Sequence, residues 1–340
     1  NATAGDLVDI NGAAGGVTLN SVIMTNDAAA FTYTLEQAAH TIAVTDINAS
    51  TGAVTITGTD DITINNTGSI TATGAANIDI DSSAGHIFSN AADDNAAEII
   101  TVDGTISLEA RDGIADSSGG DGFEIDSGGG NVTLVADGTG AVFVDYVAAD
   151  GDALTLALTA TAATGAMNYE SVATGALTLN AVSTAANNVT ISHAGPITVT
   201  TVLSTTGSQT ISNSAGDITL TDGGTAPLSL GAGALSLTSS AGAILISADA
   251  ANDDILTDGD VTLSGNGIGN TNGGIDIQLA ANGGTLTIDS QGTNDVDIDA
   301  VVDFAFAAVV ITQAVADNDI DIANATAGDL VDINGAAGGV

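Results

Sequence analysis

The chain has 340 residues, of which 42 are Asp or Glu and only one, Arg111, is Lys or Arg, so its formal net charge is −41. Such a surface repels phosphate backbones and anionic lipid heads, which excludes nucleic acid as a partner and leaves cations as the expected counterions. The absence of Cys excludes disulfides, thiolate metal sites and cysteine nucleophiles, and no uninterrupted apolar run reaches the roughly 18 residues of a membrane span.

The two ends of the chain carry the same sequence. Residues 1–17 read NATAGDLVDINGAAGGV, and residues 324–340 repeat all 17 positions at an offset of 323 residues. Identity at loop positions as well as apolar ones indicates recent tandem duplication, because packing alone would leave the loop positions free to differ. We therefore expect residues 1–323 to form one repeat unit, residues 324–340 to begin the next, and the chain to be a window of a longer array.

Short apolar–X–apolar triads recur between these ends, separated by Gly, Asn, Asp and Ser. This period of two places the outer Val, Ile or Leu residues on a buried face and the central residue, usually Thr, Ser or Asp, on the opposite face. The triads therefore predict short, half-buried β-strands, which include residues 17–19, 54–56, 62–64, 78–80, 132–134, 177–179, 189–191, 218–220, 235–237, 261–263 and 286–288.

The spacing of the triads distinguishes between β architectures. Their centres often lie roughly 8 to 12 residues apart, which suits a sandwich, a barrel or a solenoid. A sandwich with one core for over 300 residues would need longer strands and larger core residues, whereas a solenoid grows one coil at a time from short strands. We therefore predict an all-β, parallel β-solenoid (β-helix) that continues through the repeat join, with outward Thr residues stacked coil on coil. With about 20 residues per coil, one period would contain about 16 coils and advance roughly 75–80 Å.

Several segments resemble filamentous-haemagglutinin-type repeats, namely GGNVTLVADGTG (129–140), AGDITLTDGG (215–224), GALSLTSSAGAILISA (233–248) and DGDVTLSGNGIG (258–269). Repeats of that type belong to giant secreted bacterial exoproteins and adhesins. The resemblance implies a right-handed winding of the β-helix and export from the cell. The perfect identity of the two ends differs from the variable repeats of that family and favours a uniform fibre.

Clusters of acidic residues are the main chemical feature of the chain. Like residues on adjacent coils of a solenoid lie about 4.8 Å apart, so stacked carboxylates repel each other unless cations or water screen them. Oxygen-only ligands select hard ions, which makes Ca²⁺ the candidate metal; the alternative is a solvated acidic face that keeps a large secreted fibre soluble. The candidate Ca²⁺ ligands are Asp295, Asp297, Asp299, Asp303, Asp317, Asp319 and Asp321, then Asp253, Asp254, Asp258 and Asp260, and finally Asp121, Glu124 and Asp126.

Residues 301–311, VVDFAFAAVVI, are apolar on both faces of the expected strand. A half-buried strand should be apolar on one face only. One interpretation is a lateral contact with another chain through Phe304, Phe306, Val309 and Ile311, and the other is a locally wider core that a loop covers.

Together these features predict a structural extracellular fibre or adhesin shaft built from tandem β-solenoid repeats. The alternative is a calcium-loaded component of a bacterial surface layer or biofilm matrix, and a third, weaker hypothesis is a polysaccharide-processing β-helix enzyme. We expect no catalytic residues and no required cofactor, with Ca²⁺ as the candidate ion. The expected partners are further copies of the chain, by end-to-end continuation and lateral bundling, and surface or glycan contacts. The expected location is extracellular or at the cell surface.

Overall fold

The computed structural model describes most of the chain between residues 8 and 324. The described residues are 8–11, 17–19, 22–23, 33–37, 41–90, 96–116, 122–161, 165–183, 187–204, 206–221, 226–247, 253–269, 274–279, 284–292, 294–300, 308–313 and 320–324. They form strands joined by turns, with no helix, and divide into two compact units, Asn1–Gly175 and Ala176–Val340.

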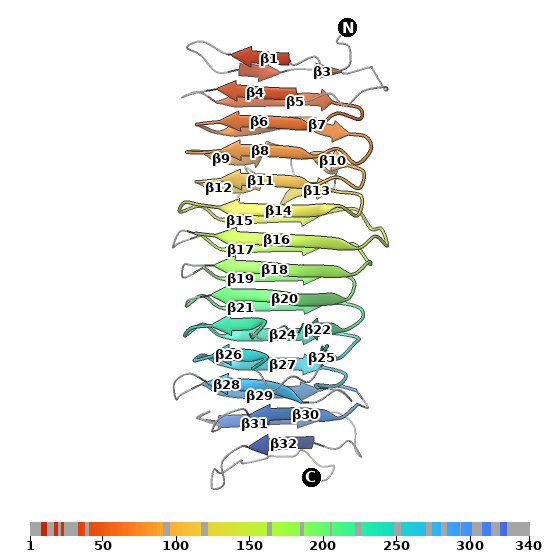
Figure 1. Cartoon of the computed structure of the whole chain (residues 1–340), viewed down its shortest axis with the longest axis vertical. Coiled ribbons are helices and arrows are strands. Elements are labelled where there is room, and N and C mark those ends of the chain that lie inside the picture. The colour runs from red at the N-terminus through yellow and green to blue at the C-terminus, as the bar shows by residue number, and fades with distance from the viewer. Residues whose placement is uncertain are drawn as a thin grey trace. The chain divides into compact units, whose positions relative to one another are not determined.

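Unit 1 contains two parallel sheets whose strands stack one coil on the next (Figure 1). The first sheet has the order β1 (Val8–Asn11), β4 (Tyr33–Gln37), β6 (Val54–Gly58), β8 (Ile78–Ser82), β11 (Ile106–Ala110), β14 (Asn131–Ala136) and β16 (Leu154–Ala160). The second contains β2 (Val17–Leu19), β3 (Val22–Ile23), β5 (Ile42–Asn48), β7 (Ile62–Ala72), β9 (His86–Ser89), β10 (Ile99–Thr101), β12 (Gly113–Asp116), β13 (Phe123–Asp126), β15 (Val142–Tyr146) and β17 (Met167–Ser171).

Unit 2 repeats the same arrangement. Its first sheet contains β18 (Leu177–Ser183), β20 (Ile197–Ser204), β22 (Ile218–Leu220), β23 (Leu228–Leu230), β25 (Ile244–Ile246), β26 (Ile255–Thr257), β28 (Ile275–Leu279), β30 (Val296–Ala300) and β32 (Ile320–Asn324). Its second sheet has the order β19 (Val189–His193), β21 (Gln209–Asn213), β24 (Leu235–Ser239), β27 (Val261–Gly265), β29 (Thr285–Ser290) and β31 (Ala308–Gln313). The predicted all-β parallel solenoid is therefore confirmed, and each predicted triad lies within a strand; the right-handed winding stays a prediction.

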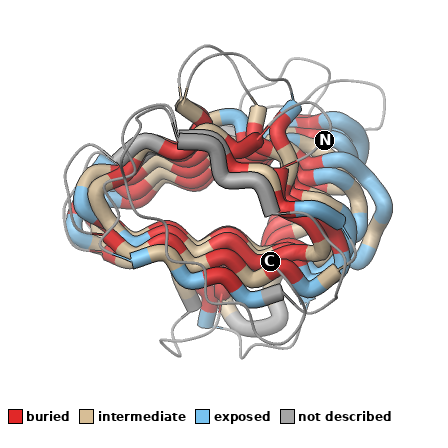
Figure 2. The backbone as a smooth tube through the Cα atoms, turned by 90° about the horizontal axis from the view of Figure 1, so that it is seen from below, coloured by how far each residue is buried: buried red, intermediate tan, exposed pale blue. Residues whose placement is uncertain are grey.

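The core of each unit consists of apolar columns between the two sheets. In unit 1 one column runs through Ile56, Ile80, Leu108, Leu134 and Leu158, which pair in register on successive strands and are at most 1% exposed. The residues between them face outward, so buried and less buried positions alternate along the strands (Figure 2). Each coil thus buries its apolar side chains against the next coil as well as across the interior.

The predicted stacking of outward Thr residues is also confirmed. Thr178, Thr198 and Thr219 occupy the same register position on β18, β20 and β22. Thr residues suit this place because β-branched side chains pack well on a pleated, half-buried surface.

Coils are longer than the sequence predicted. The step between paired residues is 20 residues from Leu177 to Ile197 but 28 residues from Ile78 to Ile106, against an expected value of about 20. Several coils are lengthened because one long strand pairs with two shorter ones in line, as β20 does with β22 and β23. The expected repeat boundary at residues 323 and 324 falls at the end of β32, and residues 325–340 lie outside the described part of the chain.

Candidate functional site

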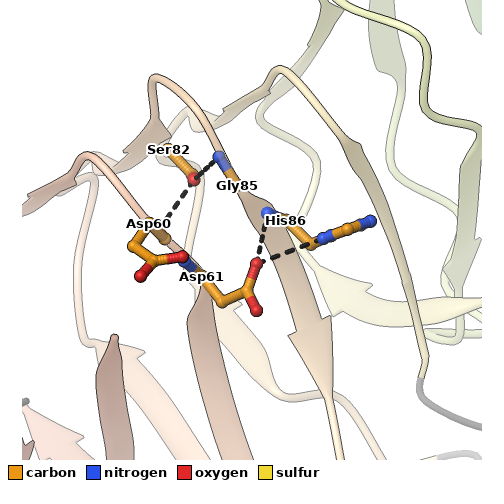
Figure 3. Close-up of polar contacts among 5 residues, drawn as sticks. All are labelled: Asp60, Asp61, Ser82, Gly85 and His86. Carbon is orange, nitrogen blue, oxygen red and sulfur yellow. Dashed lines mark hydrogen bonds and ion pairs between the residues drawn. The ribbon is translucent and has the colours of Figure 1, made fainter. Parts of the chain in front are cut away.

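A turn between adjacent coils of unit 1 shows how the acidic residues are used (Figure 3). Asp61 directly precedes β7, and its Oδ1 accepts a hydrogen bond from the main-chain N–H of His86 at 3.0 Å and lies 3.1 Å from His86 Nδ1. Asp60 Oδ1 accepts the main-chain N–H of Asp61 at 3.0 Å. Ser82 Oγ donates to the carbonyl oxygen of Asp60 at 2.9 Å and accepts the N–H of Gly85 at 3.1 Å. One carboxylate therefore ties one coil to the next at the point where a strand begins.

The same turn explains one glycine. A Cβ on Gly85 would lie 2.5 Å from main-chain atoms of Asp60 and Asp61. Such an approach is shorter than van der Waals contact allows, so the close passage of the two coils requires a residue without a side chain. The close passage of Asp60 and Asp61 therefore requires glycine at position 85.

The role of Asp61 recurs in both units. We use the name strand-leading residue for an Asp, Asn or Glu that directly precedes a strand and accepts, through its side-chain oxygen, the main-chain N–H at the equivalent position one coil later. The other pairs, acceptor first, are Asn77 with Thr105 (3.0 Å), Glu98 with Glu124 (2.9 Å), Asn188 with Ser208 (3.0 Å), Asp217 with Ala243 (2.8 Å), Asp254 with Asp276 (2.9 Å) and Asp260 with Thr285 (2.7 Å).

Strand-leading residues extend the hydrogen-bond ladder of the sheet beyond its strands. The carbonyl oxygen of Asp217 accepts from Ile197 of the preceding coil at 2.9 Å, while its side chain accepts from Ala243 of the following coil. Asp260 is used in the same way, between Leu235 and Thr285. Because a buried main-chain N–H without an acceptor is costly, a short acceptor side chain here stabilises the stacking of coils.

Sequence reasoning missed this role, although the sequence contains its signal. The strand-leading residue stands directly before a triad in Asp61-Ile62-Thr63-Ile64, in residues 217–220 (DITL) and in residues 260–263 (DVTL). An Asp or Asn directly before an apolar–X–apolar triad identifies five of the seven strand-leading residues, whereas Glu98 and Asp254 precede other sequences.

Glu98 and Glu124 form a buried acidic pair at the start of β10 and β13. Their side chains are 3% and 2% exposed, and they occupy equivalent positions on adjacent coils. Glu98 Oε1 accepts from Ser89 Oγ and Oε2 from the N–H of Glu124, both at 2.9 Å. Burial raises the pKa of Glu98 above its ordinary value, and the hydrogen bonds from Ser89 and the main chain oppose that rise.

A second acidic group lies on the outer face of the first sheet of unit 1. Asp81 and Glu109 pair in register on β8 and β11. Burial raises the pKa of both carboxyls. The charges of Asp79 and Asp137 raise the pKa of Asp81 further, and those of Asp81, Asp137 and Asp79 raise the pKa of Glu109 further. The sequence did not predict this group because its members are far apart along the chain, and only the 28-residue step between β8 and β11 brings Asp81 beside Glu109.

The candidate Ca²⁺ ligands in unit 2 differ in burial and in hydrogen bonding. Asp254 is buried and, like Asp260, acts as a strand-leading residue. Burial raises the pKa of Asp253, and Asp258 is half-buried. Asp295 is exposed and Asp297 half-buried, and the backbone of Asp297 pairs with that of Asp321. The backbone of Asp299 pairs with that of Asp276, and Asp303, Asp317 and Asp319 lie outside the described residues.

Of the candidate Ca²⁺ ligands in unit 1, the structure describes Glu124 and Asp126. Glu124 belongs to the buried pair, and Asp121 lies outside the described residues. Asp126 Oδ1 accepts the N–H of Gly128 at 2.9 Å and lies 3.4 Å from the hydroxyl of Tyr146, which also lies 3.2 Å from Asp150 Oδ2. Burial raises the pKa of Tyr146, so its phenol keeps its proton, and the two carboxylates share this one donor. Among the residues that the structure describes, no three acidic or His side chains come together in a way that could hold a metal ion.

The described residues of the predicted lateral contact, Val309 and Ile311, lie on the inner face of their strand. Ile311 is 4% exposed, and Val309 is half-buried opposite the core residue Leu286, so both belong to the inner face of β31. The outward apolar residue is Val310, which is 47% exposed. Phe304 and Phe306 lie outside the described residues, and the lateral contact through this segment stays a prediction.

Ion pairs contribute little to the described part of the chain. The one pair found there joins Asp61 to His86, which carries a charge only when protonated, and their side chains are 34% and 51% exposed. Arg111 is exposed and makes no ion pair with a described acidic residue. Exposed pairs stabilise proteins only weakly, so hydrogen bonds and apolar columns hold the coils together.

Comparison with known proteins assigns no role to this chain. Comparisons with protein-family models, with curated proteins and with solved structures found no match. Within the described residues there is no helix long and apolar enough to cross a membrane. The described architecture defines the chain as a β-solenoid in which five acidic residues, Asp61, Glu98, Asp217, Asp254 and Asp260, link successive coils through main-chain hydrogen bonds.

Proposed function

We propose that this chain is one period of a structural extracellular fibre or adhesin shaft that is built from tandem β-solenoid repeats at the surface of a bacterial cell. The observation that carries the proposal is the identity of residues 1–17 with residues 324–340, in a chain whose coils repeat one stacking scheme in both units. A solenoid whose ends are the same sequence can continue coil by coil into the next period.

The use of the acidic residues supports a structural role rather than an enzymatic one. Strand-leading carboxylates accept main-chain hydrogen bonds between coils, as Asp217 does from Ala243. A glycosidase would need two carboxylates facing one substrate, about 5 to 10 Å apart. The carboxylates of Glu98 and Glu124 are adjacent, but both are buried away from any substrate.

Imaging of an array of three tandem periods tests the proposal. Steps of 20 to 29 residues per coil correspond to about 13 coils in 323 residues and an axial repeat of about 65 Å at ~4.8 Å per coil. We expect slender filaments with this repeat in electron micrographs. Compact particles, or turnover of polysaccharides by the purified chain, would contradict the proposal.

Calcium chelation separates the fibre from its calcium-loaded alternative. A surface-layer or matrix component that is held together by Ca²⁺ should lose filament integrity and thermal stability in a chelator. We expect both to stay unchanged, because several of the described acidic residues accept main-chain hydrogen bonds and no three described acidic or His side chains are grouped in a way that could hold a metal ion.

A further inference from the structure

One outer face of unit 2 carries little charge for so acidic a chain. The second sheet of unit 2 has one strand per coil, and the outward positions at the centre of these strands form two rows that run across the coils. We call them together the hydroxyl face. One row contains Thr190, Thr210, Ser236, Thr262, Thr287 and Val310, and the other Ser192, Ser212, Thr238, Ser264, Asp289 and Thr312. Of these residues Ser264 alone is buried, at 8% exposure.

The hydroxyl face is almost free of charge. Asp289 is its one carboxylate, and it accepts two hydrogen bonds from neighbouring side chains. Gln291 Nε2 donates to Asp289 Oδ2 at 2.9 Å, and Ser264 Oγ donates to the same oxygen at 3.4 Å. By contrast, the second sheet of unit 1 has Glu124, Asp145 and Glu170 in register on β13, β15 and β17. In a chain of net charge −41, the hydroxyl face is thus a surface where another copy can approach without strong repulsion.

The hydroxyl face is also suited to close packing. Its side chains are small, and its strands are parallel and in register from β19 to β31. Two such faces can interdigitate with their sheets about 10 Å apart, as small side chains do in dry sheet-to-sheet contacts. Val310, 47% exposed at one end of the face, adds apolar surface that such a contact would cover.

We propose that the hydroxyl face is a lateral self-association surface whose partner is the same face of a second copy of this chain. The inference rests on the proposed fibre, because the interface area that one period offers determines how strongly two chains pair. Six strands at ~4.8 Å by about five residues at ~3.3 Å give roughly 480 Å² per partner, or about 950 Å² for both. Stable interfaces bury about 1,200–2,000 Å², so one period pairs weakly, and tandem periods bind more tightly through their linkage.

Sedimentation velocity on chains of one and three tandem periods tests this proposal. We expect one period to be mostly single and three periods to pair laterally. The variant Thr210→Asp/Thr238→Asp, in every period, places charge at the centre of the hydroxyl face and should weaken pairing tenfold or more. The matched control Thr178→Asp/Thr219→Asp adds the same charge to outward, half-buried positions of the other sheet of unit 2 and should pair as the unsubstituted chain does.

Three results would overturn the lateral inference: unsubstituted three-period chains that stay single, hydroxyl-face variants that pair normally, or a control that loses pairing equally. Circular dichroism and thermal melting verify that each variant is folded. Micrographs of the same samples separate the two proposals. Single filaments with the expected axial repeat would refute lateral pairing and leave the fibre standing, whereas compact particles would refute the fibre itself.

Discussion

At the scale of single residues, the acidic side chains of this protein have distinct roles that depend on their position in the coil. An Asp directly before a strand accepts a main-chain hydrogen bond from the next coil, and Asn77 and Asn188 make the same bond without a charge. This position therefore requires an acceptor oxygen on a short side chain and does not require a charge.

Substitution of Asp217 tests this interpretation. Asp217→Ala removes the acceptor of the N–H of Ala243, which is 6% exposed, and should lower the free energy of unfolding by about 1–3 kcal/mol. Asp217→Asn keeps an acceptor oxygen and should cost less than about 1 kcal/mol. Chemical denaturation measures both. Equal losses in the two variants would show that charge, and not the hydrogen bond, matters at this position.

The pH dependence of stability follows from the buried acidic groups. Burial raises the pKa of Glu98 above 4.5, its ordinary value, so the folded chain binds a proton that the unfolded chain releases more readily. This contribution to stability is present below the unfolded pKa and is lost as pH rises through the folded pKa. The pKa values of Asp81, Glu109 and Asp253 shift in the same direction. We expect the melting temperature to rise as pH falls from 7 toward 5.

Glu98→Gln isolates the contribution of the buried pair. The amide imitates the protonated carboxyl, since its oxygen can accept from the N–H of Glu124 and its NH₂ can donate to Ser89 Oγ. We expect higher stability at pH 7 and a flatter pH profile in thermal melts. Glu170→Gln removes the same charge from an exposed position and serves as the control. A Glu98→Gln profile as steep as that of the control variant would contradict this account.

At the scale of strands and coils, stability comes from columns of apolar side chains that contact the neighbouring coils. Leu108 on β11 is fully buried between Ile80 on β8 and Leu134 on β14. Each coil in a solenoid contacts chiefly the coils next to it, so damage to one column should remain local.

Leu108→Ala tests how far such damage extends. Loss of the buried side chain should cost about 2–5 kcal/mol, and hydrogen exchange should report weakened protection in β8, β11 and β14 but not in the strands of unit 2. Ser107→Ala, at the neighbouring outward position, should change little. An equal loss of protection throughout the chain would show that the fold is one cooperative block.

At the scale of the whole molecule, the large negative charge and the tandem sequence act together. A net charge of −41 keeps chains apart in general, while the solenoid uses hydrogen bonds and apolar columns that need no counterion. The hydroxyl face of unit 2 is the exception that would let fibres bundle. The number of periods, rather than any single residue, would then determine how strongly two fibres associate.

The sequence by itself determined the class of fold and the positions of the strands. The triads at residues 54–56, 132–134 and 261–263 lie within β6, β14 and β27, because alternate side chains of a strand point to the same face and an apolar period of two buries that face. Tandem duplication was likewise readable without a structure. The length of the coils could not be predicted from the sequence, since it depends on where one long strand pairs with two short strands in the next coil.

Only the tertiary structure decided which acidic residues meet. Asp81 lies beside Glu109, and Glu98 beside Glu124, because particular coils step by 28 and 26 residues, and no local pattern encodes those steps. The same is true of the hydroxyl face, whose two rows exist only when six strands stack in register. Local alternation specifies which way a side chain points, whereas the step between coils specifies its neighbours.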